Sequence, residues 1–303
     1  MMPLPTDFLL GTAQSLATVS EAEQRMLLRT GAVLPSPEEL QRFMQFVRAV
    51  VFPGFYDQRT SSSDTRLFHT GVAVEQIYSI LCRQIARGFV FCREQGAESG
   101  ISALANSLAE RFVTELPEIK RLVLTDVEAV ALRDPAVSNY GEVVLSYPCI
   151  MEMLHHRTAH ALYRLGVPVI PRMIAEQAHS LTGIDIHPAA QIGEYFSIDH
   201  GTGVVIGETT VIGNRVMLYQ GVTLGAKNFQ YDSEGRPMDL PRHPVIEDRV
   251  TIYSNASILG RVRIGHDSVI GGNVWITRDV PPGSRITQSG PVVEREFADG
   301  SGI

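Results

Sequence analysis

The spacing of apolar residues follows one period before about residue 180 and another after it. In the first part, apolar residues recur at intervals of three and four, which is typical of amphipathic helices. This pattern predicts helices at about residues 37–50, 65–95, 101–115, 118–132, 146–165 and 171–181. Alternation with period two is scarce there, so residues 1–180 are predicted to form an all-α domain.

The first of these helices has a well-marked predicted start. Residues 36–39 read Ser-Pro-Glu-Glu, a capping box with Pro37 in the first helical position. The Phe-Pro-Gly sequence at residues 52–54 is expected to end the helix.

After residue 180 the apolar period becomes six. About a quarter of positions in an average chain are aliphatic. The chance that six successive positions spaced six apart are all aliphatic is therefore on the order of 10⁻⁴. The repeat predicts a left-handed parallel β-helix over residues 181–282, in which three six-residue sides make one coil and each aliphatic side chain points inward. The glycine that often follows is expected to permit the corner. The three registers are Ile186, Ile192 and Ile198; Ile206, Ile212, Leu218 and Leu224; and Ile246, Ile252, Ile258, Ile264, Ile270 and Ile276.

Two breaks interrupt this repeat, and each carries a histidine beside a charged residue. The register slips by two across residues 199–203, which read Asp-His-Gly-Thr-Gly, and a loop without the repeat occupies residues 225–245. Solenoids usually confine their insertions to one face, which is often the binding face.

Composition excludes several classes of protein. The formal net charge is −7 and only two of the 26 basic residues are lysines, so no basic surface for nucleic acid is expected. The three cysteines, Cys82, Cys92 and Cys149, are too scattered for a disulfide framework or a structural zinc site. Neither a signal peptide nor an apolar run of ~20 residues is present, so we expect a cytoplasmic protein that does not enter a membrane.

The ordered motifs in residues 125–282 resemble serine O-acetyltransferases. They are Arg-Asp-Pro-Ala-Val at 133–137, Asp-Ile-His-Pro at 185–188, the 199–203 motif, Gly-Glu-Thr at 207–209, Gly-Val-Thr-Leu-Gly at 221–225 and Arg-His-Pro at 242–244. The resemblance implies direct transfer of acetyl from acetyl-CoA to the hydroxyl of L-serine, without a metal, giving O-acetyl-L-serine for cysteine biosynthesis.

The resemblance also implies the active-site residues. A serine hydroxyl is a poor nucleophile, so a general base must take its proton, and that base needs an acidic partner. The family pattern assigns the base to His200 and the orienting carboxylate to Asp185. It places the substrate carboxylate on Arg242 and the hydroxyl near His243, and gives the ammonium group to Asp134 and Asp199.

Further expectations come from the same resemblance. Acetyl-CoA would bind along a groove that includes Gly225, Ala226, Ser254 and Gly272, and the oligomer would be a trimer or a dimer of trimers with sites between subunits. The tail, residues 283–303, would bind O-acetylserine sulfhydrylase (cysteine synthase) through Ile303, although it ends Gly-Ser-Gly-Ile and not in the commoner Asp-Gly-Ile. L-Cysteine would compete with L-serine. Loop 227–240 is longer than in the commonest bacterial forms.

Several alternatives stay open at this point. A related O-acetyltransferase could act on homoserine, O-phosphoserine or another small acceptor, because one methylene changes binding by only about 1–3 kcal/mol. A β-helix carbonic anhydrase would need three convergent histidines on zinc. A scaffold without activity could bind the sulfhydrylase through its tail alone. His155, His156 and His160 lie in a predicted helix without a metalloprotease spacing, and His187 and His266 are also interpreted as structural.

Overall fold

The computed structural model describes residues 6–26, 33–56, 63–92, 100–228, 231–236, 238 and 240–288. The chain divides into two compact units, residues 1–34 and 35–303. The first unit contains α1 (Thr6–Ala17) and α2 (Glu21–Met26), which the apolar pattern did not predict. All further description concerns the second unit.

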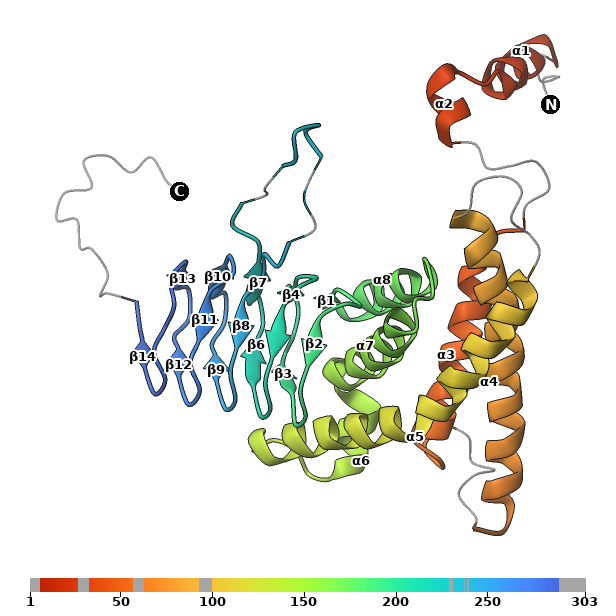
Figure 1. The fold of residues 1–303 in the computed structure, drawn as a ribbon. Helices are drawn as coiled ribbons and strands as arrows, with labels where there is room; N and C mark the ends of the chain where they lie inside the picture. Colours follow the sequence, from red (N-terminus) through yellow and green to blue (C-terminus); the bar gives the residue numbers. More distant parts are fainter. Residues whose placement is uncertain are drawn as a thin grey trace, which may run out of the picture. The chain divides into compact units, whose positions relative to one another are not determined.

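The first part of the second unit is helical, as predicted (Figure 1). Its helices are α3 (Pro37–Val51), α4 (Ser63–Cys92), α5 (Ile101–Arg133), α6 (Tyr140–Ser146), α7 (Pro148–Arg164) and α8 (Ile170–Thr182). The helices predicted at 101–115 and 118–132 are one helix, α5, which continues through Pro117. A proline removes one backbone hydrogen bond, but α5 buries Phe112 and Leu116 before Pro117 and Ile119 and Val123 after it. Packing of this continuous apolar face keeps the helix in one piece.

The predicted capping box at the start of α3 is half formed. The Ser36 hydroxyl accepts the amide hydrogen of Glu39 at 3.2 Å, as in a capping box. The Ser36 amide, however, donates to the Gln84 side chain of α4 at 2.8 Å. The cap therefore also ties α3 to α4.

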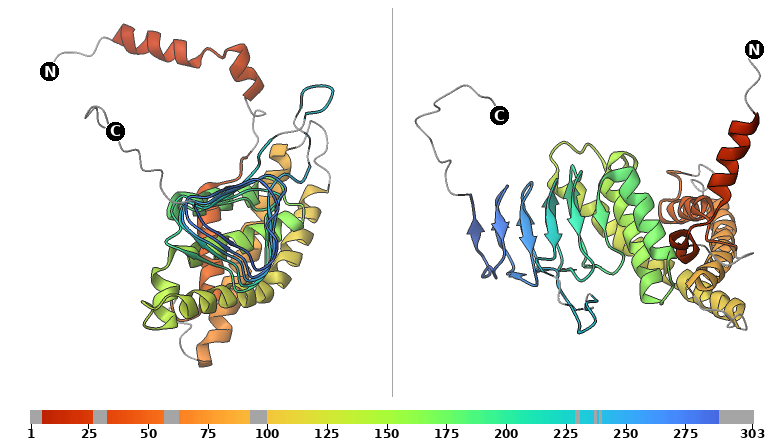
Figure 2. Two further views of the ribbon diagram at one scale, coloured as in Figure 1. Left: turned by 90° about the vertical axis from the view of Figure 1, so that its left-hand side faces the viewer. Right: turned by 90° about the horizontal axis from the view of Figure 1, so that it is seen from above.

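The second part is a parallel β-helix with three sheets, and Figure 2 shows its three-sided section end-on. The first sheet has the order β1-β4-β7-β10-β13, the second β2-β5-β8-β11, and the third β3-β6-β9-β12-β14. This confirms the predicted fold class. The strands are β1 (Asp185–Ile186), β2 (Gln191–Ile192), β3 (Ser197–Asp199), β4 (Val205–Ile206), β5 (Val211–Ile212), β6 (Met217–Tyr219), β7 (Thr223–Gly225), β8 (Val245–Ile246), β9 (Thr251–Ile252), β10 (Ser257–Leu259), β11 (Arg263–Ile264), β12 (Val269–Ile270), β13 (Trp275–Ile276) and β14 (Arg285–Ile286). The last strand lies beyond residue 282, because Val269 and Ile270 still pair with it.

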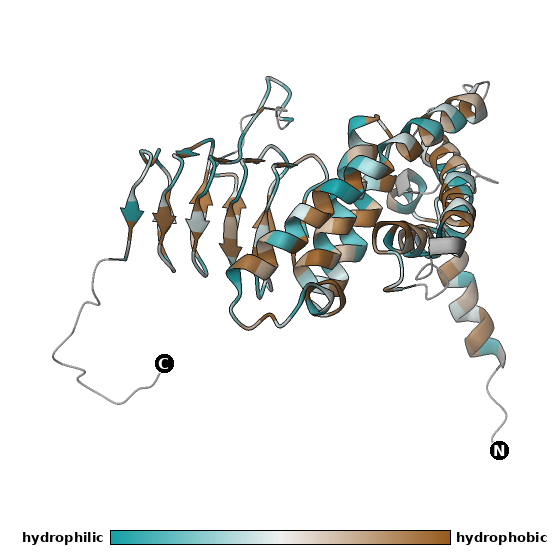
Figure 3. Ribbon diagram, turned by 90° about the horizontal axis from the view of Figure 1, so that it is seen from below, coloured by the Kyte–Doolittle hydropathy of each residue, from teal (hydrophilic) through white to brown (hydrophobic). Residues whose placement is uncertain are grey.

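Aliphatic residues of the repeat fill the prism, and the hydropathy colouring of Figure 3 shows the apolar strand positions. Ile206, Leu224 and Ile258 stack in register in the first sheet and are buried. Their burial forms the continuous core that no single coil could make.

The repeat glycines allow successive coils to stack closely at the corners. A Cβ on Gly193 would lie 2.6 Å from the carbonyl oxygen of Gly213, so the requirement is close approach of the next coil and not a left-handed backbone. The left-handed conformation instead falls two residues later, as at Tyr195 (φ 56°) and Arg215 (φ 59°).

A buried ion pair joins the helices to the first coil of the β-helix. The Arg157 guanidinium of α7 binds both carboxylate oxygens of Asp126 of α5, at 2.8 and 2.9 Å. It also donates to the carbonyl oxygens of Ile192 and Gly193, at 3.1 and 2.7 Å, and Asp126 accepts the amide hydrogen of Phe196. Helices and β-helix therefore form one compact unit.

We expect Arg157→Met to destabilise the protein by about 3–5 kcal/mol, because it leaves Asp126 as an unpaired buried charge. The measurement is the urea midpoint at a fixed protein concentration. Arg121→Met removes an exposed arginine that pairs with Glu118 and Glu194 and should leave the midpoint nearly unchanged. Equal midpoint shifts in the two variants would contradict the structural role of Arg157.

Candidate functional site

His200 lies at the corner where the chain passes from the third sheet to the first. This His200 corner comprises residues 200–204, 220–222, 254–256 and 272–274. Asp185 pairs with Val205 twenty residues later, whereas Val205 pairs with Thr223 after eighteen, so the first coil has two extra residues. His200 has a left-handed backbone (φ 60°), and its side chain is 70% exposed. The register slip seen in the sequence therefore makes a histidine protrude from the prism.

Carboxylates from two parts of the chain lie near His200. Asp199 Oδ2 is 3.8 Å from His200 Nε2. Asp134, at the end of α5, accepts the Tyr147 hydroxyl hydrogen at 2.6 Å and the Ala136 amide hydrogen at 2.8 Å. These two hydrogen bonds, and the charge of His200, lower the pKa of Asp134, so it is ionised at neutral pH.

Asp185, the predicted partner of His200, lies at the start of β1. In the part of the chain that the structure describes, no hydrogen bond or ion pair joins the two. Ligand atoms of Asp185, Glu176 and His179 instead lie within 4.8 Å of one another, and such exposed groups are common without a metal. Behind them, burial raises the pKa of Glu152 to about 8, and the charge of Asp185 adds to this rise.

Arg242 and His243 lie at a different corner, between the first and second sheets. This His243 corner comprises residues 187–190, 207–210, 226–228, 240–244 and 260–262. Arg242 forms an ion pair with Glu208. The His243 ring packs on Gly207, where a Cβ would lie 2.0 Å from its Cδ2 atom. Burial and the neighbouring Arg242 lower the pKa of His243 to about 4.

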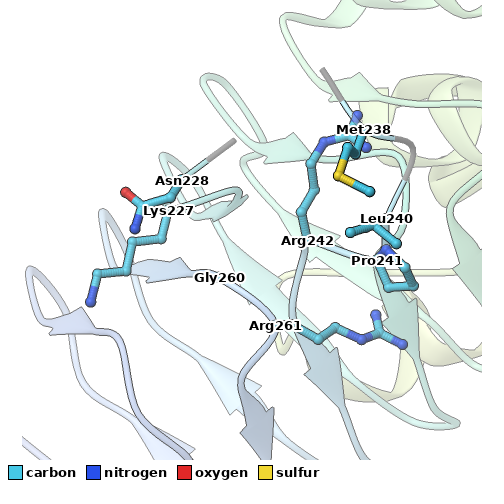
Figure 4. A pocket seen from close by; sticks show the side chains of 8 residues that line it. All are labelled: Lys227, Asn228, Met238, Leu240, Pro241, Arg242, Gly260 and Arg261. Atoms are coloured by element: carbon cyan, nitrogen blue, oxygen red, sulfur yellow. The ribbon is translucent and has the colours of Figure 1, made fainter. Parts of the chain in front are cut away.

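A cavity of about 190 Å³ opens beside Arg242 (Figure 4). Lys227, Arg242 and Arg261 bring three positive charges to its wall, so it suits an anionic group. It lies against the loop of residues 225–245 that interrupts the repeat.

The four residues predicted to bind CoA divide between the two corners. Ser254 and Gly272 lie one coil apart at the His200 corner, where a Cβ on Gly272 would be 3.0 Å from the Ser254 carbonyl oxygen. Gly225 ends β7 and Ala226 follows it, at the start of the His243 corner. In a single chain the predicted site residues therefore lie at two different corners, and no ion pair or hydrogen bond joins His200 to Arg242 or His243 among the described residues. Ile303 lies outside those residues.

Sequence reasoning missed two polar residues that bind predicted site residues. Tyr147 binds Asp134, and its pKa is raised to about 12 because the phenol donates to that carboxylate. Thr209 binds His243, although only its place in the Gly-Glu-Thr motif drew attention to it. Tyrosine before proline carries no signal of this kind, so Tyr147 could not have been found.

The discounted histidines have structural surroundings. His155 and His156 are buried in α7, and His160 Nδ1 is 2.8 Å from the Pro188 carbonyl oxygen. Burial raises the pKa of Cys149 to about 12, so this thiol is not a nucleophile.

Comparisons with known proteins agree with the fold and the motifs. A family model described as bacterial transferase hexapeptide (six repeats) matches residues 243–278. Together with the three-sided prism, this places the protein in the class of hexapeptide-repeat transferases. A curated serine acetyltransferase of Synechococcus elongatus (plasmid) is 44% identical over 96% of this chain and 93% of its own. The chain belongs to the serine acetyltransferase family and is therefore an acyltransferase.

Other relatives and solved structures carry the same name. The serine acetyltransferase of Bacillus subtilis is 40% identical over 58% of this chain and 82% of its own. Isoform 3 from Entamoeba histolytica, solved with cysteine, superposes with a TM-score of 0.70 at 33% identity, covering 84% of each chain. The Neisseria gonorrhoeae enzyme, solved with serine, gives 0.53 at 26% identity, covering 82% of this chain and 95% of that one. Among the described residues, no helix is long and apolar enough to span a membrane.

We expect Gly207→Ala to destabilise the protein by about 1–3 kcal/mol, because its Cβ would overlap the His243 ring. Gly71→Ala in α4 is the matched control: nothing lies within 4 Å of its Cβ position, and alanine favours a helix. Urea midpoints of both variants at one protein concentration test this. A Gly207→Ala midpoint at or above that of Gly71→Ala would contradict the packing of His243.

Proposed function

We propose that the protein transfers acetyl from acetyl-CoA directly to the hydroxyl of L-serine, forming O-acetyl-L-serine and free CoA. Membership of the serine acetyltransferase family supports this reaction, and the residues at the His200 corner support its mechanism. There a protruding histidine stands beside two carboxylates, which suits a base that becomes positively charged during the reaction.

In this mechanism His200 accepts the serine hydroxyl proton as the oxygen attacks the thioester carbon. The C–S bond then breaks, and the CoA sulfur takes the proton from His200. No acyl-enzyme forms, because no side chain acts as nucleophile. We assign Asp185 as the residue that orients His200, which requires the two to approach when substrate binds.

The remaining substrate contacts follow from charge. Asp134 and Asp199 would bind the ammonium group, and Arg242 would bind the carboxylate as a bidentate partner in place of Glu208. These groups lie at two corners of one prism. We therefore propose that the His200 corner of one chain meets the His243 corner of a second copy, in a trimer or a dimer of trimers. L-Cysteine, which resembles L-serine in size and charge, would compete for the same place.

Acetyl-CoA would lie in the groove between two prisms. Its pantetheine arm would follow the small residues Ser254 and Gly272 at one corner and Gly225 and Ala226 at the other. The cavity with Lys227, Arg242 and Arg261 would receive phosphate groups. This reaction needs no metal, and the compartment we propose is the cytoplasm.

The reaction is tested by free CoA release from acetyl-CoA with serine, homoserine or O-phosphoserine as acceptor. We expect release to depend on serine, and His200→Ala to reduce kcat by about 10²–10⁴-fold because it removes the general base. A preference for homoserine would reassign the acceptor. Equal rates with and without every acceptor, or full activity of His200→Ala, would overturn the transferase mechanism and favour a scaffold.

We further propose that the tail ending at Ile303 binds O-acetylserine sulfhydrylase through its free carboxylate. Deletion of Ile303 should abolish binding to the sulfhydrylase, measured by titration calorimetry, without changing acetyl transfer. The matched control is Ile303→Val, which keeps an aliphatic side chain and a free carboxylate and should bind within about tenfold, since about one methylene is lost. Unchanged affinity after the deletion would exclude this partner.

A further inference from the structure

Thr209 lies in the turn between β4 and β5 and forms the hydrogen-bonding centre of the His243 corner. Its hydroxyl oxygen accepts the amide hydrogens of Arg242 at 2.9 Å and His243 at 3.1 Å. A hydroxyl oxygen has two acceptor positions, and both are now occupied. The hydroxyl hydrogen must therefore point to another acceptor, and His243 Nδ1 lies 2.9 Å away.

The backbone of Thr209 reaches the same ring nitrogen. Its amide donates to His243 Nδ1 at 3.1 Å, and a backbone amide can only donate. Nδ1 consequently carries a lone pair and no hydrogen. In a neutral imidazole the proton must then sit on Nε2.

The charges around His243 keep the ring neutral. Its pKa is lowered to about 4 by burial and by Arg242, His187 and Arg261, while Glu208 opposes them. At pH 7, well above this value, the ring is uncharged. It can thus donate a hydrogen bond from Nε2, but a neutral ring with so low a pKa is a weak base.

The Nε2 atom has no partner within the described part of the chain. Every hydrogen bond between the His243 ring and the described residues is accepted by Nδ1, and the ring packs on Gly207. The donor is therefore available to a ligand.

We propose that Thr209 is a positioning residue that holds His243 as the Nε2-protonated tautomer, and that His243 donates a hydrogen bond to the acceptor hydroxyl oxygen. This inference rests on the proposed function. The hydroxyl proton goes to His200, the oxygen forms its bond to the thioester carbon, and the His243 proton stays on Nε2. Because the attacking oxygen gains negative charge as it loses its proton, this hydrogen bond strengthens toward the transition state.

The tautomer is tested without any reference to activity. A long-range proton–nitrogen correlation spectrum of ¹⁵N-histidine-labelled protein at pH 7, with His243 assigned from a His243→Gln variant, should show a bare Nδ1 and a protonated Nε2. A protonated Nδ1 would overturn the inference, even in a protein that acetylates serine. Absence of acceptor-dependent CoA release from the wild type would instead count against the proposed function, while the tautomer remains measurable.

The role of Thr209 is tested with a matched pair of variants. Thr209→Val keeps the shape but loses the hydroxyl, and kcat/KM for serine should fall about tenfold, the effect of one hydrogen bond. Its His243 pKa should rise, because one of two donors to the Nδ1 lone pair is gone. Thr209→Ser keeps the hydroxyl and should retain both the activity and the low pKa. Equal behaviour of the two variants would overturn the role of Thr209.

The donor role is tested at His243 itself. The amide nitrogen of glutamine can reach the position of Nε2, whereas that of asparagine reaches only the position of Nδ1. We expect His243→Gln to keep a higher kcat than His243→Asn. Equal loss in both would show that a hydrogen-bond donor at Nε2 is not what the reaction requires.

Discussion

The buried pair of Asp126 and Arg157 is the interaction on which the rest of the structure depends. A β-helix begins with a coil that has no coil beneath it, so its backbone groups need other partners. The Arg157 guanidinium donates hydrogen bonds to two carbonyl oxygens of this coil, and the Asp126 carboxylate accepts the amide hydrogen of Phe196. The charges would be costly to bury separately, but each completes the other's hydrogen bonding. The helical part is therefore a cap that completes the first coil.

The helical cap also places a charged side chain beside the β-helix. Because Asp126 fixes α5 against the first coil, the end of that helix brings Asp134 near His200. Next to it, the Arg133 guanidinium donates to the carbonyl oxygen of Arg215, which binds the same helix end to the second coil. A stable β-helix alone would present His200 with Asp199 only. The second carboxylate, that of Asp134, comes from the end of α5. Its position depends on the Asp126–Arg157 ion pair, which lies about 12 Å earlier along the helix at a rise of 1.5 Å per residue.

The sequence could predict the features that follow its six-residue period, but not hydrogen bonds between individual side chains. The period of six fixed the register of Ile206, Leu224 and Ile258, since a slip by one residue would turn their side chains out of the core. The protrusion of His200 was readable as a break in that period. By contrast, the hydrogen bond from Tyr147 to Asp134 joins two residues that lie just outside helices, and no periodic signal encodes it. The repeat glycines were recognised, but the sequence does not show whether a glycine is required by a turn of its own backbone or by close approach of the next coil.

The two histidines of the proposed site differ in what surrounds them, and this decides what each can do. His200 is largely exposed, and the carboxylates of Asp199 and Asp134 lie near it. His243 is buried beside Arg242 and Arg261, so a positive charge on its ring would be repelled there. In the proposed mechanism the same type of side chain serves as a base at the acidic corner and as a neutral donor at the basic corner. Within one chain the two histidines lie at different corners of the prism, so the proposed reaction requires the His243 corner of a second copy beside the His200 corner.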